Sequence, residues 1–149
     1  MAQINTRRKQ ALVDIKAALV AMTTTVFQEV SYTLKSPEEV QVFPAAYIVG
    51  GGGDRIPADI QNVHFDHSTE IVIYTYWKEA TYGNLALELE DMIEDVLNKL
   101  DAVGQTKKTS EGYDFYVSHV ETDEGTLSSV GLPISMAIIT VTALLPASD

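Results

Sequence analysis

The stretch GNLALELEDMIEDVLNKLDAV, residues 83–103, decides the fold. Its apolar side chains recur at i, i+4, i+7, i+8, i+11, i+12 and i+15, which places them on one stripe of an α-helix. They are Leu85, Leu89, Met92, Ile93, Val96, Leu97 and Leu100. Acidic side chains cover most of the remaining surface, and Gly104 is placed to end the helix. Such a helix must lie on an apolar surface, and the β-type runs on either side of it are the obvious partners.

A second helix and five strands are predicted around this helix. The second helix covers residues 5–22, where apolar side chains again recur at helical spacing. Apolar runs typical of strands occupy residues 26–34, 43–49, 63–77, 113–120 and 132–145. The expected element order is therefore α-β-β-β-α-β-β. Because neighbouring strands are joined by short connections, most strand pairs are expected to be antiparallel.

This order indicates the α+β fold class in a single domain that spans residues 1–149. We expect a mainly antiparallel sheet of four to five strands, with two helices packed on one face. Residues 50–62 begin with four consecutive glycines, so we expect a flexible loop or arm there. A further loop is expected at residues 121–131.

The last strand and the strand that ends at Trp77 are apolar on both sides, which is unusual for half-exposed antiparallel strands. In the last strand, Ile138 and Ile139 point to opposite faces, and each belongs to an apolar row. Two helices cover only one face of a sheet. The other face is therefore covered either by a loop such as residues 50–62 or by another subunit, because large exposed apolar patches mark interaction sites.

The chain has 149 residues and a formal net charge of −11. Phosphate contacts need Lys and Arg, so this charge argues against specific nucleic-acid binding. The absence of cysteine excludes disulfides and thiolate metal sites. The uncharged run at residues 132–145 is too short to span a bilayer and has the composition of a strand, so we expect no membrane association.

His64, Asp66 and His67 form the one cluster of ligand-type side chains. On a strand, His64 and Asp66 point to one side and His67 to the other, whereas a catalytic zinc needs three protein ligands. The glycine run lacks the Lys-Ser/Thr pair of a phosphate-binding loop, and no serine or threonine lies in a nucleophile-elbow pattern. We therefore expect no catalytic, metal or cofactor site, and we predict that the protein is not an enzyme.

Five segments, taken in order, carry a family resemblance. They are TRRKQALVDI at 6–15, FPAAYIV at 43–49, TEIVIY at 69–74, VSHVETD at 117–123 and SMAIITVTAL at 135–144. Their order and hydrophobic pattern are similar to those of the tail-terminator proteins of long-tailed bacteriophages, also called tail-completion or minor tail proteins. The similarity covers nearly the whole chain, except for the glycine run and the segment that follows it.

The resemblance implies a structural virion protein, assembled in the host cytoplasm, at the head-proximal end of the tail. Such proteins form a homo-oligomeric ring, typically a hexamer, that caps the tail tube and ends its polymerisation. The ring then presents a joining surface to head-completion or neck proteins, and DNA passes through its bore. Six copies multiply the charge of −11, and an acidic bore would repel passing DNA.

The residues expected at the partner interface are basic or belong to the glycine-rich segment. They are Arg7, Arg8, Lys9, Gly50, Gly51, Gly52, Gly53, Asp54 and Arg55. The basic cluster is either solvated or in contact with an acidic partner surface. Two other functions stay open: another phage neck, connector or tail-tube subunit, or a small metal- or ligand-binding enzyme that uses His64, Asp66 and the glycine loop.

Overall fold

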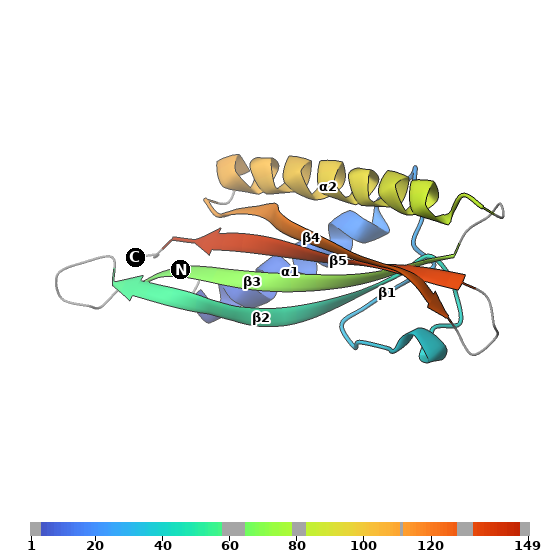
Figure 1. The fold of residues 1–149 in the computed structure, drawn as a ribbon. Helices are drawn as coiled ribbons and strands as arrows, with labels where there is room; N and C mark the ends of the chain where they lie inside the picture. The colour runs from blue at the N-terminus through green and yellow to red at the C-terminus, as the bar shows by residue number, and fades with distance from the viewer. Residues whose placement is uncertain (1–3, 58–64, 79–82, 111, 128–132, 147–149) are drawn as a thin grey trace.

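The apolar stripe of the long helix α2, Leu85–Ser110, lies on a five-stranded sheet (Figure 1). The structure is a computed structural model that describes residues 4–57, 65–78, 83–110, 112–127 and 133–146. Five of the seven predicted stripe residues are buried, and the other two, Leu85 and Leu97, are partly buried. The spacing of apolar residues in this stretch therefore predicted both the helix and its buried side.

The remaining elements follow the predicted order. They are α1 (Ile4–Val20), β1 (Glu29–Ser31), the short 3-10 helix η1 (Pro37–Glu39), β2 (Ala45–Pro57), β3 (Phe65–Lys78), β4 (Asp114–Leu127) and β5 (Pro133–Leu145). The strand order in the sheet is β1-β2-β3-β5-β4. Among the described strand pairs, β1 and β2 pair in parallel and the other pairs are antiparallel. The α+β class and the mainly antiparallel sheet are thus confirmed.

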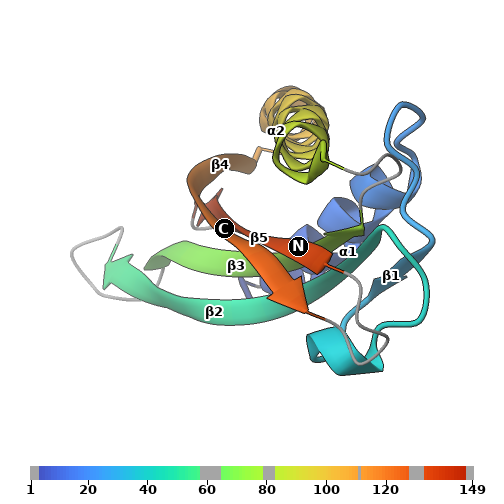
Figure 2. The same cartoon turned by 45° about the vertical axis from the view of Figure 1, so that its right-hand side comes forward.

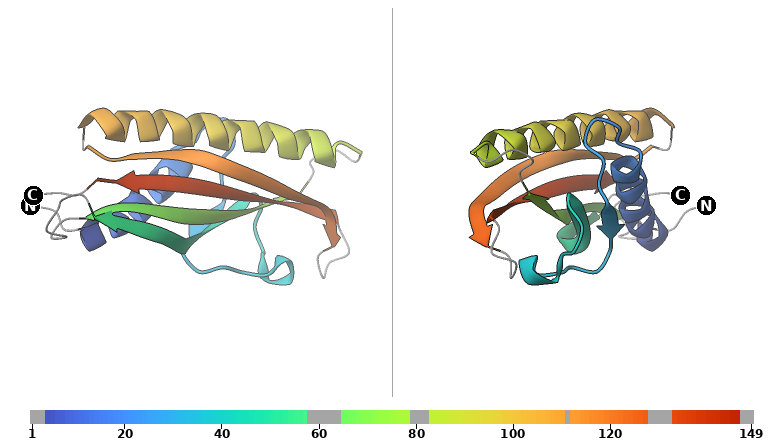
Figure 3. Two further views of the ribbon diagram at one scale, coloured as in Figure 1. Left: turned by 60° about the vertical axis from the view of Figure 1, so that its left-hand side comes forward. Right: turned by 90° about the vertical axis from the view of Figure 1, so that its right-hand side faces the viewer.

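Both helices lie on the same face of the sheet, which we call the inner face (Figures 2 and 3). Helix α2 packs along β4, whereas α1 crosses behind β2 and β3 in Figure 1. One large apolar cluster joins the two helices to the inner face, and its largest fully buried members include Ile15, Leu19, Ile73, Leu100 and Ile139. The burial of this cluster is the main source of the fold's stability.

The sequence predicted that α2 ends at Gly104, but the helix continues to Ser110. Gly104 is buried, and a Cβ built on it would lie 1.9 Å from the carbonyl oxygen of Phe115. The glycine therefore lets the helix backbone approach the β4 backbone, a role unrelated to helix termination. Asp101 on α2 also accepts a hydrogen bond at 3.0 Å from the backbone N–H of Val117.

The glycine run is also different from the prediction, because residues 50–57 continue β2 as a strand. The β2–β3 register shifts between Gly50 and Gly53, which marks an irregularity of the β-bulge type. A Cβ on Gly51 would lie 2.8 Å from the Glu70 carbonyl oxygen, and one on Gly53 would lie 1.9 Å from that of Ser68. These glycines are thus required by close strand contact. The rest of the predicted loop, residues 58–62, lies outside the described residues.

Two strands differ in length from the prediction. Strand β1 has three residues instead of the predicted span 26–34, and Val26, Tyr32 and Leu34 are exposed because the segment pairs with β2 only at residues 29–31. Strand β4 continues to Leu127 through the first part of the predicted loop 121–131. It stays paired with β5 across two register shifts, and the polar residues Glu121 to Asp123 are tolerated there because this strand is an edge exposed to solvent.

Candidate functional site

The face of the sheet opposite the helices, which we call the outer face, is covered by described residues only at one end. There, Val40 from the segment after η1 packs with Tyr47, Tyr76 and Ile134 in a small apolar cluster. Tyr47 donates a hydrogen bond to Glu29, and Tyr76 donates one to the backbone carbonyl of Lys35 at 2.8 Å. The segment between β1 and β2 is thereby fixed over this end of the face.

The rest of the outer face is a partly exposed apolar strip. Strand register places Val72 opposite Thr140 and Tyr74 opposite Ile138. These side chains are only partly buried, as are those of Val49 and Met136. Residues 50–57 do not cover the strip, because they lie within the sheet itself as part of β2. The prediction that a loop at residues 50–62 covers this face is therefore wrong for residues 50–57. Cover by another subunit stays a prediction.

Carboxylates surround the apolar strip on the outer face. The register places six acidic side chains on this face: Asp54, Asp66, Glu70, Asp114, Glu121 and Asp123. All of them except Asp114 are exposed, and Asp114 is partly exposed. The outer face therefore combines an apolar centre with a margin that is mainly acidic, although the exposed Lys78 also lies on it.

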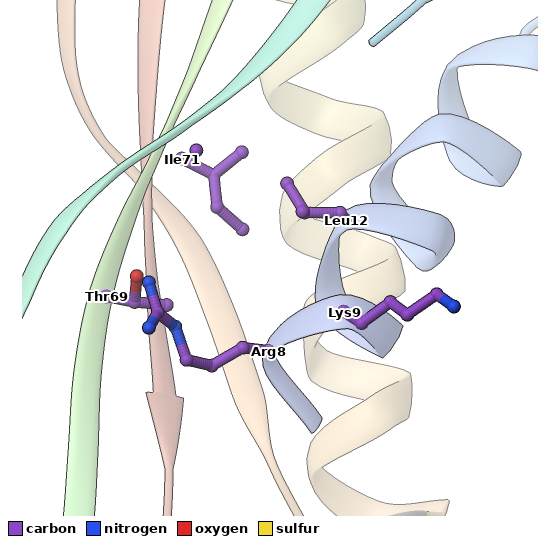
Figure 4. A pocket seen from close by; sticks show the side chains of 6 residues that line it. Arg8, Lys9, Leu12, Thr69 and Ile71 are labelled. Carbon is purple, nitrogen blue, oxygen red and sulfur yellow. The ribbon is translucent and has the colours of Figure 1, made fainter. Parts of the chain in front are cut away.

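A pocket opens between α1 and the first half of the sheet (Figure 4). Its volume is about 320 Å³, and it is lined by Arg8, Lys9, Leu12, Gly50, Thr69 and Ile71. Arg8 extends from α1 toward Thr69 on β3, and Leu12 faces Ile71, whereas the Lys9 side chain is directed away from the strands. The floor of the pocket is apolar. We call it the basic pocket, because its rim carries two exposed cations, Arg8 and Lys9.

The structure brings together some of the residues predicted at the partner interface. Arg8, Lys9 and Gly50, which are far apart in the sequence, line the same pocket. Arg55 lies further along β2, with its guanidinium 4.2 Å from the ring centroid of Phe65. The remaining predicted residues on β2 continue away from the pocket along the strand: Gly51, Gly52, Gly53 and Asp54. Arg7 belongs to α1, but its side chain is not among the described ones.

The ligand-type cluster is divided, as the strand periodicity predicted. Asp66 is exposed on the outer face, whereas His67 is buried on the inner face, and His64 lies outside the described residues. Burial lowers the pKa of His67, and the charges of Arg8 and Arg55 lower it further. Its Nδ1 atom has no hydrogen-bond partner among the described residues. Within the described part of the chain, no three His, Cys, Asp or Glu side chains are placed to hold a metal ion.

A buried carboxylate that sequence reasoning missed links three elements. Asp14 of α1 is 8% exposed and accepts hydrogen bonds from Tyr113, which precedes β4, and from Gln10 at 2.9 Å. The Lys107 ammonium near the end of α2 lies 3.6 Å from the same carboxylate. The signal was an acidic residue beside the apolar stripe of the first helix. Its role is to position α1, α2 and β4 relative to one another.

An open sheet face with an apolar centre, together with a charged pocket, is typical of a subunit that contacts other proteins. Neither helix of the described structure is long and apolar enough to cross a membrane. The sequence matches the family model described as Bacteriophage Tail Tube Terminator Protein over residues 2–143. The chain therefore belongs to this family and is a structural component of the phage virion, which confirms the resemblance. No curated protein matches the sequence.

Proposed function

We propose that this protein forms a ring of identical copies, six in number, on the head-proximal end of the phage tail tube. The ring ends tube polymerisation and presents a surface to the head-completion or neck proteins, and DNA passes through its bore. Membership of the tail-terminator family supports a role of this kind among the tail proteins. The observation that carries the proposal is the outer face, whose apolar centre the described part of the chain leaves partly exposed.

The apolar strip supports contact between copies. Val72, Tyr74 and Ile138 lie side by side on strands β3 and β5, and each is only partly buried. Partly exposed apolar surface is costly in water, and that cost is removed when another protein covers it. A neighbouring copy that covers this strip would explain why β5 is apolar on both of its faces.

The acidic margin supports a bore that DNA passes through. Glu121 and Asp123 lie on the edge strand β4, and Asp54, Asp66 and Glu70 lie at the far end of β2 and β3. Carboxylates at these positions stay exposed when a neighbour covers only the centre of the face. Their negative potential repels the DNA phosphates and prevents the chain from binding the DNA that it conducts.

The test is the symmetry of particles formed by the purified protein, measured by light scattering and negative-stain imaging, alone and with the tail-tube protein of the same phage. We expect six-fold rings, and tubes that stop growing once a ring is bound. Long cylinders of this chain alone would instead identify a tail-tube subunit. A strict monomer under both conditions would contradict ring formation.

A substitution on the strip gives a sharper form of the same test. Ile138→Glu places a charge on the outer face, where it would be buried by a neighbour, and it should prevent ring formation without unfolding the subunit. The matched control is Val20→Glu, because Val20 is an exposed apolar residue of α1, which lies on the opposite side of the sheet. Rings that form equally well from both variants would show that copies do not cover the strip.

A further inference from the structure

We propose that the basic pocket of one copy receives the first turns of α2 from the next copy. This inference rests on the proposed assembly of copies and names one contact within it. Leu87 would enter the pocket, while Glu90 and Asp91 would pair with Arg8 and Lys9 at its rim. The occupant is thus an amphipathic helix segment of the same chain, with an apolar side chain and adjacent carboxylates.

The chemistry of the pocket fits this occupant. Leu12 and Ile71 supply an apolar wall, and the backbone of Gly50 leaves room at the β2 side. Arg8 and Lys9 are exposed at the rim, and neither has an ion pair with another described residue. An apolar cavity with two cations at its mouth binds a ligand that carries an apolar group to fill the cavity and anionic groups beside it.

The first turns of α2 have that character. Leu87 is 69% exposed, more than any other large hydrophobic side chain described. Glu90, Asp91 and Glu94 follow it at i+3, i+4 and i+7, so all four lie on one side of the helix, and all are exposed. We call these residues the exposed row. No described residue of the same copy covers Leu87, because the opposite side of α2 packs on the sheet.

The positions of the two surfaces favour a head-to-tail contact. The basic pocket lies at the start of α1, whereas the exposed row lies at the opposite end of the molecule, where α2 begins (Figures 1 and 3). Two different surfaces at opposite ends form a heterologous contact, which closes into a ring when the rotation between copies is suitable. The contact therefore agrees with a ring and does not require the two-fold symmetry of a simple dimer.

Charge complementarity selects a second copy over other ligands. The chain has a net charge of −11, and its exposed row supplies adjacent carboxylates on a rigid helix. Because the cations and the carboxylates are exposed in the free subunit, salt should weaken their attraction strongly. The apolar contribution of Leu87 should persist at high salt.

The experiment measures self-association of the full chain by sedimentation velocity, at low and high salt, with four variants. The pocket variant is R8E/K9E and the helix variant is E90K/D91K. The third variant carries all four substitutions, and the fourth, K99E/K108E, is a control that reverses two lysines of α2 away from the pocket and from the outer face. Circular dichroism confirms that each variant is folded.

Each reversed variant alone should associate about tenfold or more weakly than the control, because like charges then face each other across the contact. An equimolar mixture of R8E/K9E with E90K/D91K should associate again, since each pocket then meets a helix of opposite charge. The chain with all four substitutions should also recover association. Leu87→Ser should weaken association at high salt as well as at low salt.

The inference is overturned if R8E/K9E associates as well as K99E/K108E, if charge reversal on α2 fails to restore association, or if the unmodified chain stays monomeric at low salt. Rings that form regardless of R8E/K9E would leave the proposed function standing and remove only this contact. Conversely, recovery in the charge-reversed mixture without any capping of tubes would support the contact and contradict the terminator function. Binding of the basic pocket to an acidic segment of the tube protein alone would also overturn the inference.

Discussion

The two faces of the sheet differ strongly in burial, although the residues of β5 on the two faces are similarly apolar. Ile138 and Ile139 are neighbours in β5 and chemically identical, yet Ile139 is fully buried under the helices and Ile138 is partly exposed on the outer face. The helices, and not the strand, create this difference, because both helices lie on the inner face. One apolar strand can therefore serve folding with one row of side chains and assembly with the other.

The largest expected effect tests this difference directly. Ile139→Ala should lower the free energy of unfolding by about 2–5 kcal/mol, since it leaves a cavity in the packed core. Ile138→Ala should lower it by only about 1 kcal/mol in the free subunit. Urea unfolding of the two variants measures both values. Equal losses would mean that the outer face is as well packed as the inner one, and the comparison between the faces would fail.

The close contact between α2 and β4 should produce the next largest effect. Gly104→Ala improves intrinsic helix propensity by about 1 kcal/mol, but its methyl group would meet the Phe115 carbonyl oxygen. We expect a net loss of about 1–3 kcal/mol in the free energy of unfolding, because helix and strand must separate. The control is Ala102→Gly, at an exposed position of the same helix, where only propensity is lost. A stabilised Gly104→Ala variant would show that α2 moves freely over the sheet.

The buried carboxylate on the inner side should contribute somewhat less. Asp14→Ala removes the carboxylate that the Tyr113 hydroxyl and the Lys107 ammonium share, which should cost about 1–3 kcal/mol. Tyr113→Phe in the same background should then recover part of the loss. Thermal unfolding of the single and double variants checks this coupling, and simple additivity would contradict it.

The smallest effect is a pH dependence that separates the faces. The pKa of His67 on the inner face is lowered from 6.5, so the unfolded chain binds more protons, and stability should fall as pH drops below 6.5. The pKa of Glu29 is lowered from 4.5 by hydrogen bonds from Tyr47 and Lys35, so its stabilisation is present above pH 4.5 and is lost as pH falls further. Urea unfolding measured across pH should show this. His67→Gln should lose only the fall in stability below pH 6.5, and Glu29→Gln should lose only the fall below pH 4.5.

Residue periodicity predicted the helices, the element order and the fold class, because amphipathic spacing depends only on which side chains must avoid water. It also predicted that Asp66 and His67 point to opposite faces. The lengths of β1 and β4 could not be derived in this way, since they depend on pairing with partner strands. Polar residues in the second half of β4 predicted a loop, but the strand continues there. Alternating residues around β1 predicted a strand over 26–34, but only three residues pair.

The glycines were misinterpreted for a related reason. A glycine after a helical pattern or in a run is typical of an end or a loop, but Gly104 and Gly53 instead lie where two backbones nearly touch. No local pattern distinguishes these roles, because the contacting atoms belong to Phe115 and Ser68. Likewise, the basic pocket joins Arg8 to Gly50 only through the packing of α1 on the sheet.

Strand β2 pairs with β1 only through residues 45–47, so no described strand pairs with its outward edge beyond Tyr47. An unprotected edge is a template for aggregation between newly synthesised copies. The residues along this stretch oppose that outcome: Asp54 and Arg55 carry charge, the glycines favour strand pairing poorly, and Pro57 lacks the amide hydrogen that a ladder needs. The subunit is thereby protected from premature fibre formation while its concentration rises in an infected cell.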